Sequence, residues 1–269
     1  MELKREAVSE SIGYLIIFAL ILTGIGLITL YGYPLLLAQQ SSANTRNMEE
    51  TMIVLQNDIK SLTYKLANYK ETSLMVSGGS LSLYGFSNTL QKFNIVTSDG
   101  SINYNFFPGE LRYFSTNDNT FITIENGAVI EKPLATNGSF MLADPRWYLD
   151  TSSSTLVINL MNLSTGPGTS QLLSETGVGT VSMHLLRANM TSATIGGVNP
   201  SVTITYNPDP KNITPDGYGL AWQTYLNNTN NFPGGMVCTG NPLTAQPLVC
   251  TEPAQNIIVK EYDIVVDSI

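Results

Sequence analysis

Two cysteines near the end of the chain are the residues best placed for covalent chemistry. Cys238 and Cys250 enclose an eleven-residue loop that contains Pro and Gly. Outside the cell, two cysteines at this spacing favour a disulfide, and closing a loop of about 15 residues contributes about 3 kcal/mol in the chain-entropy model. Two free thiols, or half of a metal site, are the alternatives. A metal site is disfavoured because His184 is the only histidine and lies in a separate strand-like run.

The sequence lacks the motifs that usually mark a catalytic site. It contains no G-x-S-x-G, H-E-x-x-H or C-x-x-C motif and no Gly-rich phosphate loop. A single histidine leaves little room for a Ser-His-acid arrangement, and His184 is more typical of a half-buried strand residue than of a base. The chain is therefore expected to have no catalytic residues, no metal and no cofactor, and not to be an enzyme.

Two polar stretches could bind small ligands. Residues 115–120, STNDNT, carry oxygen ligands that suit Ca²⁺, but they lack the glycine and terminal glutamate of the known calcium loop. A turn between two strands is the favoured interpretation. Residues 144–147, DPRW, could bind a sugar or pack against the edge of a sheet, and packing is favoured.

N-x-Ser/Thr sequons mark possible sites of N-glycosylation. They begin at Asn137, Asn162, Asn189, Asn212 and Asn227. The chain is rich in Asn, Ser and Thr, so this number is about what chance provides. Each sequon is a candidate glycan acceptor because it falls in the part of the chain expected to face water.

The elements that position these residues begin with a long apolar segment. Residues 12–37 carry no charge, and about 20 apolar helical residues suffice to cross a hydrocarbon core of about 30 Å. A buried core helix is rarely uncharged over such a length, and the apolar region of a cleaved secretory signal is shorter, about 7 to 15 residues. A retained membrane helix is therefore predicted. Lys4 and Arg5 precede it, so the N-terminus is expected inside and the C-terminal bulk outside.

The stretch KREAVSESIGYLIIFALILTG resembles the start of archaeal type IV pilin-like (prepilin- or archaellin-like) membrane-anchored surface proteins. Their pattern is a basic residue, a small residue and Val-Ser-x-x-Ile-Gly before a long apolar run. The matching residues are Arg5, Ala7, Val8, Ser9, Ile12 and Gly13. The resemblance implies that a membrane-bound prepilin peptidase cuts between Ala7 and Val8 and leaves the apolar helix on the mature protein.

The chain departs from the family pattern at two positions. Glu6 separates the basic residue from Ala7, and Glu10 becomes the third mature residue, whereas many related filament subunits have a glutamate at the fifth. Two later stretches, FITIENGAVIEKP and GYGLAWQTYL, are also similar to membrane-anchored archaeal relatives of these pilins. The resemblance thus covers the N-terminal motif and two short stretches further along.

Beyond the membrane segment, apolar residues recur in steps of four and three along a predicted helix. They are Met48, Met52, Leu55, Ile59, Leu62, Leu66 and Tyr69, here called the stripe. A period of about 3.5 residues is typical of a helix that buries one face. This face could dock on the protein's own outer domain or on a neighbouring subunit, and self-docking is favoured. In the membrane, Gly24 and Gly26 could allow close helix packing, although no GxxxG pattern is present.

The expected organisation has three parts. Residues 1–10 form a cytoplasmic leader. Residues 11–70 form one long helix, kinked at Gly32-Tyr33-Pro34, with a membrane part (12–37) and an extracellular stalk (38–70). Residues 72–269 form a β-rich extracellular domain.

The outer domain consists of short alternating runs rich in β-branched and aromatic residues, which predict strands. Asp99-Gly100 and Asn126-Gly127 predict two-residue hairpin turns, and residues 215–226 predict a short helix that covers a sheet. The predicted fold is α+β: one long helix, then a mainly antiparallel, sandwich-like β domain, together shaped like a lollipop.

The charge distribution bears on the partners of the outer domain. The whole net charge of −8 lies after Lys70, because the six basic and six acidic residues up to that point cancel. Such a polyanion is a poor partner for nucleic acid, and the charge is expected to keep a water-facing domain soluble.

The leading functional expectation is structural. The chain would be a major or minor subunit of an archaeal type IV pilus-like filament, anchored by its N-terminal helix and assembled with copies of itself or with co-subunits. It would lie in the cell membrane as a single-pass protein or in an extracellular filament. The alternative is a non-polymerising anchored module that binds a glycan, an S-layer component or another extracellular ligand. An anchored hydrolase is a third possibility.

Overall fold

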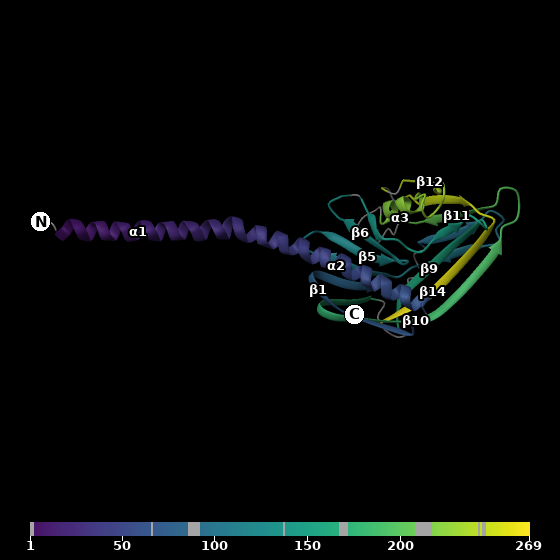
Figure 1. Cartoon of the computed structure of the whole chain (residues 1–269), viewed down its shortest axis with the longest axis horizontal. Helices are drawn as coiled ribbons and strands as arrows, with labels where there is room; N and C mark the ends of the chain where they lie inside the picture. The colour runs from purple at the N-terminus through teal and green to yellow at the C-terminus, as the bar shows by residue number, and fades with distance from the viewer. Residues whose placement is uncertain are drawn as a thin grey trace. The chain divides into compact units, whose positions relative to one another are not determined.

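The computed structural model in Figure 1 describes residues 3–65, 67–85, 92–136, 138–166, 172–207, 217–241, 243 and 246–269. The chain divides into two compact units, Met1–Asn44 and Thr45–Ile269. The second unit is called the head below. Each unit has its own local structure and is described separately.

The first unit is helical. Helix α1 spans Leu3–Leu27, a π-helical segment spans Ile28–Gly32, and α2 (Tyr33–Tyr64) begins directly after it. Pro34 has no backbone N–H to donate to the preceding turn, and its ring crowds the carbonyl four residues earlier. The N–H of Tyr33 instead donates to the carbonyl of Ile28, five residues back. A local change of helix type therefore lies at residues 28–32, directly before Tyr33 and Pro34, and the kink at Gly32-Tyr33-Pro34 stays a prediction.

The long helix ends earlier than the sequence predicts. Helix α2 ends at Tyr64 rather than at residue 70, and strand β1 (Tyr69–Tyr84) begins five residues later. Tyr69 pairs with His184 in a β-ladder, and its side chain is 52% exposed. The apolar step to Tyr69 fits the helical period, but β1 alternates between exposed and buried residues and gains a full ladder of hydrogen bonds. The prediction that Tyr69 belongs to the stripe was wrong for this reason.

The head contains two sheets whose described strands follow a simple order. The large sheet is arranged β7-β6-β5-β4-β1-β10-β14-β9-β8 and the small sheet β12-β13-β11-β2-β3. In the large sheet the strand bounds are β7 Phe140–Ala143, β6 Ala128–Pro133, β5 Thr120–Glu125, β4 Glu110–Ser115, β10 Leu172–Thr194, β14 Asn256–Ser268, β9 Thr155–Thr165 and β8 Tyr148–Asp150. In the small sheet they are β12 Val237–Thr239, β13 Leu248–Pro253, β11 Ser201–Tyr206, β2 Phe93–Thr97 and β3 Asn103–Phe106. Among the described strands, every pairing is antiparallel except that of β9 with β14, which is parallel.

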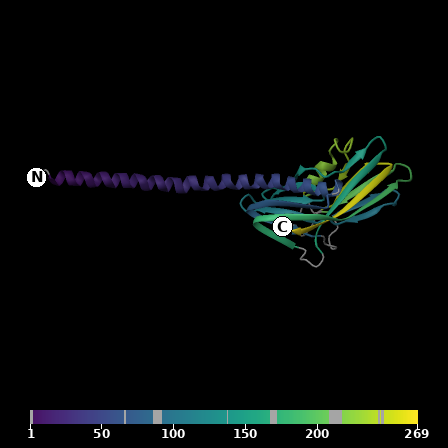
Figure 2. The ribbon, with the colours of Figure 1, turned by 60° about the horizontal axis from the view of Figure 1, so that its bottom comes forward.

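The head has three layers, with the large sheet in the middle (Figures 1 and 2). On one face of this sheet, the stripe of α2 forms a core with residues such as Ile122 and Ile264. On the other face, Ile158 and Ile257 form a second core with the small sheet and with α3 (Gly219–Leu226). Strand β5 is buried along its whole length because it is covered on both faces. The predicted order, one long apolar N-terminal helix followed by a mainly antiparallel β-rich domain, is confirmed.

One of the two predicted hairpin turns has the expected form. Asn126 and Gly127 join β5 to β6 directly, and both have positive φ (49° and 75°), as a type I′ turn requires. Asp99 and Gly100 instead lie in a five-residue connection, residues 98–102, in which Gly100 has a positive φ and Asp99 does not. The Asp99 carboxylate accepts hydrogen bonds from the N–H groups of Ser101 and Gly196, so the side chain organises a wider loop.

The structure also describes the STNDNT stretch and the short helix predicted at residues 215–226. Residues 116–119 connect β4 to β5, so the STNDNT stretch is the turn between strands that was favoured. Helix α3 begins at Gly219, later than the predicted start. Residues 215 and 216 of the prediction lie outside the described residues.

Candidate functional site

The stripe packs on the head's own large sheet. Met48, Met52, Leu55, Ile59 and Leu62 are all at most 1% exposed and belong to the core beneath α2. Leu66, the sixth predicted packing residue, lies outside the described residues. Self-docking therefore accounts for the burial of the stripe within a single chain.

The first unit presents a continuous apolar surface. Among the described residues, Ile12–Tyr64 is the one helix long and apolar enough to cross a membrane. A Cβ added at Gly24 or Gly26 would meet nothing within 4 Å, so neither glycine packs against another element in one chain. Ala7 and Val8, the predicted peptidase site, lie on the backbone of α1, and their side chains fall outside those described.

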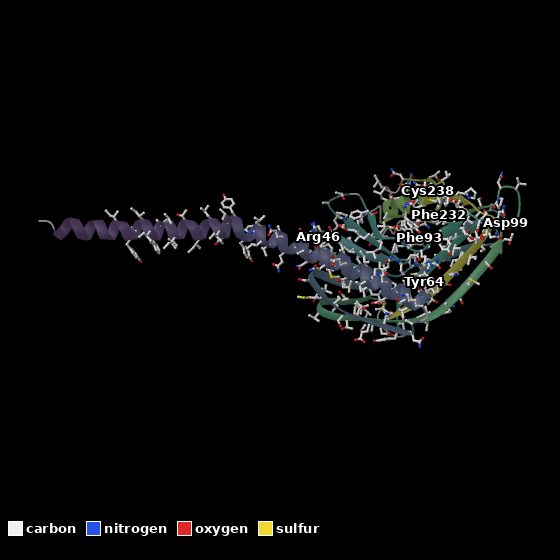
Figure 3. All side chains as sticks on the ribbon, viewed as in Figure 1. Arg46, Tyr64, Phe93, Asp99, Phe232 and Cys238 are labelled. Atoms are coloured by element: carbon white, nitrogen blue, oxygen red, sulfur yellow. A yellow bond between two sulfur atoms is a disulfide. The ribbon has the colours of Figure 1, made fainter. Side chains whose placement is uncertain are left out.

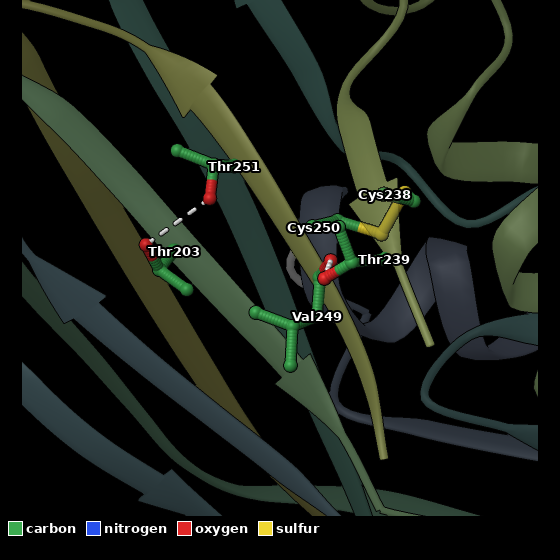
Figure 4. The surroundings of a disulfide bond; sticks show 6 residues. All are labelled: Thr203, Cys238, Thr239, Val249, Cys250 and Thr251. Carbon is green, nitrogen blue, oxygen red and sulfur yellow. Dashed lines mark hydrogen bonds between the residues drawn. A yellow bond between two sulfur atoms is a disulfide. The ribbon is translucent and has the colours of Figure 1, made fainter. Parts of the chain in front are cut away.

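The two cysteines are joined by a disulfide at the edge of the small sheet (Figure 4). Cys238 on β12 and Cys250 on β13 are direct cross-strand partners. Cys250 is fully buried and belongs to the core between the sheets. The bond therefore attaches the three-residue edge strand β12 to the body of the head.

The described sequons differ in their exposure. Asn189 on β10 and Asn227 at the end of α3 are exposed. Asn162 on β9 is half-buried, and its side-chain amide donates to the carboxylate of Asp263 at 3.2 Å, which leaves it a poor glycan acceptor. Asn137 and Asn212 lie outside the described residues.

His184 takes part in a surface ion pair. Its Nδ1 lies 2.9 Å from the Asp267 carboxylate, and both side chains are partly exposed. The pair joins β10 to β14 on the large sheet. This arrangement agrees with the interpretation of His184 as a half-buried strand residue.

A cluster of four charged residues lies buried where the two sheets meet, and no motif in the sequence predicts it. Lys92 directly precedes β2 of the small sheet, whereas Glu110, Arg112 and Glu125 lie on β4 and β5 of the large sheet. All four side chains are at most 8% exposed. Lys92 Nζ contacts Glu125 Oε2 and lies 3.5 Å from Glu110 Oε2, and Arg112 contacts the other oxygen of Glu110. The cluster is neutral overall when all four groups are ionised.

Aromatic side chains enclose this cluster. The indole N–H of Trp222 on α3 donates to Glu125 Oε1 at 3.0 Å, and the hydroxyl of Tyr206 donates to the same oxygen at 3.4 Å. Phe93, labelled in Figure 3, follows Lys92 in the chain and packs on Trp222 with ring centroids 4.8 Å apart. The two stretches FITIENGAVIEKP and GYGLAWQTYL thus meet in space, since they supply Glu125 and Trp222 respectively.

The cluster shifts the pKa values of its members. Burial lowers the pKa of Lys92, but Glu110 and Glu125 raise it, and the net change is a rise. Burial raises the pKa of Glu125, and Lys92 opposes this only in part. Both groups therefore bind their protons more tightly than they would in water, at a place where an unpaired buried charge is costly.

A second charged feature is a basic hollow of about 420 Å³ beside the C-terminal end of α2. Its lining residues are Asn57, Lys60, Ser61, Tyr64, Lys65 and Arg146. The Arg146 guanidinium stacks 4.8 Å from the centre of the Tyr64 ring, and burial lowers the pKa of Lys60. Trp147, next to Arg146, is 1% exposed and donates its indole N–H to the carbonyl of Asn159. In the DPRW stretch, packing therefore describes Trp147, whereas Arg146 faces the hollow.

These features define a class of protein: a chain with one candidate membrane helix near its N-terminus, followed by a two-sheet β head with a buried ionic cluster. The chain belongs to a family of unknown function, DUF7289, whose model matches residues 6–266. No curated protein and no solved structure matches the chain.

Proposed function

We propose that this chain is a pilin-like structural subunit, anchored in the membrane by residues 12–37 and assembled through that segment into an extracellular filament. One observation carries the proposal. Beyond residue 45, the apolar face of α2 is buried against the head's own large sheet. Between residues 12 and 37, by contrast, the large apolar side chains are 46% to 71% exposed. The exposed segment supplies a surface that either lipid or other copies of the helix can cover.

Because residues 12–37 carry no charge, the same apolar surface can be buried either in the lipid bilayer or against other subunits in a filament. A subunit that leaves the bilayer for a filament must bury the same apolar area against its neighbours. The resemblance of the N-terminal motif to type IV pilins supports this route, with a prepilin peptidase as the processing partner at Ala7-Val8. On this proposal the N-terminus is cytoplasmic in the membrane form and the head is extracellular.

Substitutions in the first unit separate insertion from assembly. Leu20→Asp places a charge near the middle of the segment, which costs about 2.5 to 3.5 kcal/mol on insertion scales, so the membrane-bound level should fall. Gly24→Leu and Gly26→Leu keep the segment apolar, so insertion should remain normal, but the added side chains should block close helix packing. The readout is the membrane-fraction level against the yield of sheared filaments for each variant. Normal filaments from both glycine variants would contradict the proposal.

The basic hollow favours a second candidate, an anchored module that binds an anionic ligand. Lys60, Lys65 and Arg146 offer three cations beside the Tyr64 ring on an otherwise acidic chain. A carboxylate-bearing sugar would fit this chemistry. Titration of the full chain with glucuronate tests this candidate: salt-sensitive binding that Arg146→Gln removes would support it, and no binding to the wild-type chain would exclude that ligand.

A further inference from the structure

We propose that the Lys92 and Glu125 side chains condense to an amide bond that covalently joins the small sheet to the large sheet. The inference rests on the buried cluster and is independent of whether the protein forms filaments. It assigns a covalent modification site to residues that no sequence motif marks.

The two reacting groups are held in contact from different layers of the head. Lys92 lies directly before β2 and Glu125 is the last residue of β5, where the following residue, Asn126, begins a tight turn. The side chains are 7% and 0% exposed, respectively. Lys92 Nζ contacts Glu125 Oε2, so the nucleophilic nitrogen lies next to the carboxyl group that it would attack. Fixed proximity of this kind can correspond to effective concentrations of about 10⁵ M or more.

The remaining contacts supply the other requirements of an acyl transfer. Trp222 Nε1–H and the Tyr206 hydroxyl both donate to Glu125 Oε1, the oxygen that would become negative in the tetrahedral intermediate. Glu110 Oε2 lies 3.5 Å from Lys92 Nζ and can accept its proton. Arg112 contacts the other Glu110 oxygen and holds this carboxylate in place.

The reaction balances without a cofactor. Glu110 takes a proton from the Lys92 ammonium, and the neutral amine attacks Cδ of Glu125. The new N–C bond forms, the bond from Cδ to Oε2 breaks, and Glu110 relays the protons lost by nitrogen to the departing oxygen. The products are an amide and one water, and Glu110 returns to its starting state.

The driving force follows from the charges in the cluster. Before condensation, two ion pairs are buried in the junction between the sheets. After it, Lys92 and Glu125 are neutral, and only the Arg112–Glu110 pair remains charged. Condensation removes two buried charges whose desolvation opposes folding, and the core between the sheets excludes the water needed for reversal.

Mass spectrometry of the full chain purified in detergent tests the proposal directly. After allowance for the disulfide and for any N-terminal cleavage, the wild-type protein should be lighter than its sequence by one water. Trypsin should fail to cut after Lys92, and a branched peptide should link Lys92 to Glu125. In Lys92→Arg, which keeps the positive charge but has no reactive amine, the loss of water should vanish.

Two further variants separate the chemistry from the fold. Glu110→Gln removes the proton acceptor while preserving shape, so the chain should keep its full mass. Lys132→Arg is the matched control at another fully buried lysine, and it should retain the loss of water. A wild-type chain at full sequence mass, or a loss of water that persists in Lys92→Arg, would overturn the proposal.

Discussion

At the scale of single residues, Glu252 is the clearest place where the head carries an electrostatic cost. It lies on β13 with its side chain turned into the head and is 3% exposed. Its Oε2 has no hydrogen-bond partner within the described part of the chain. Burial raises the pKa of its carboxyl group from 4.5 to about 7.

This shift makes the stability of the head depend on pH. Because the folded state holds the Glu252 proton more tightly, its contribution favours folding below pH 4.5 and is lost as the pH rises to about 7. Glu252→Gln should therefore raise the free energy of unfolding above pH 7 by about 1 to 3 kcal/mol, since one pKa unit corresponds to about 1.4 kcal/mol. Below pH 4.5 the substitution should have little effect.

Urea unfolding followed by tryptophan fluorescence measures this difference. Trp147 and Trp222 both lie in the core between the sheets, so their emission reports on unfolding of the head. Glu50→Gln, at an exposed carboxylate on α2, is the control and should not change with pH in this way. An equal effect of Glu252→Gln at pH 4 and pH 8 would refute the burial explanation.

Gly127 is a second residue whose identity is set by its position. It has φ of 75°, and a Cβ there would lie 2.7 Å from the sulfur of the buried Met161. Its carbonyl also accepts a hydrogen bond from Gln56 on α2 at 2.6 Å, so the turn links β5 and β6 to the helix.

Gly127→Ala should destabilise the head more than Gly100→Ala. Both glycines have positive φ, for which a Cβ costs about 1 to 2 kcal/mol, but a Cβ at Gly100 meets nothing within 4 Å. The contact with Met161 should add about 1 kcal/mol or more from overpacking. Denaturant unfolding measures both free energies of unfolding. If the two variants lose the same amount, the Met161 side chain moves away from the added Cβ at no cost, which would contradict the prediction.

At the scale of elements, the apolar periodicity of α2 corresponds directly to its packing, because the stripe residues from Met48 to Leu62 are the ones buried on the large sheet. If its stripe is stabilised by the head's own sheet, Leu55→Ala should lower the stability of an isolated, unassembled chain by about 2 to 5 kcal/mol. Val54→Ala, at a neighbouring position that is 49% exposed, should change it by at most about 0.5 kcal/mol. No loss in Leu55→Ala would indicate that the stripe needs a neighbouring subunit for its burial.

The same helix shows how far periodicity can be followed. The stripe from Met48 to Leu62 was predictable because each residue lies on one helical face. Its end was not, because Tyr69 satisfies the helical period and also begins an alternating strand pattern. The choice between them is made by the ladder with β10, whose residues lie more than a hundred positions away in the chain.

The buried ionic cluster could not be predicted for a similar reason. Lys92, Glu110 and Glu125 come from two sheets, and each looks like an ordinary polar residue at the end or start of a strand. The turn after Glu125 was predictable from its Asn-Gly pair, because only local backbone conformation is involved. A charged residue at an inward-facing strand position is the one sequence signal of a buried ion pair here. It does not identify the residue of opposite charge, which comes from a distant part of the chain.

At the scale of the whole molecule, the two units differ in where their apolar side chains lie: exposed along residues 12–37 of the first unit and buried in the cores of the second. Within the first, residues 12–37 form the uncharged apolar surface that a membrane or a helical assembly would cover, and the second carries its own two cores. The proposed amide bond and the disulfide would both strengthen the second unit, at the junction between the sheets and at the edge of the small sheet.

The N-terminus of the native protein in sheared surface filaments tests the proposed filament role most directly. The account predicts that filaments contain this chain and that its first residue is Val8, because a prepilin peptidase has cut after Ala7. The measurement is N-terminal sequencing, with intact mass as a check, on the filament fraction and the membrane fraction of the same cells. A chain that retains Met1 through Ala7, stays in the membrane fraction and is absent from filaments would contradict the account and favour the anchored binding module.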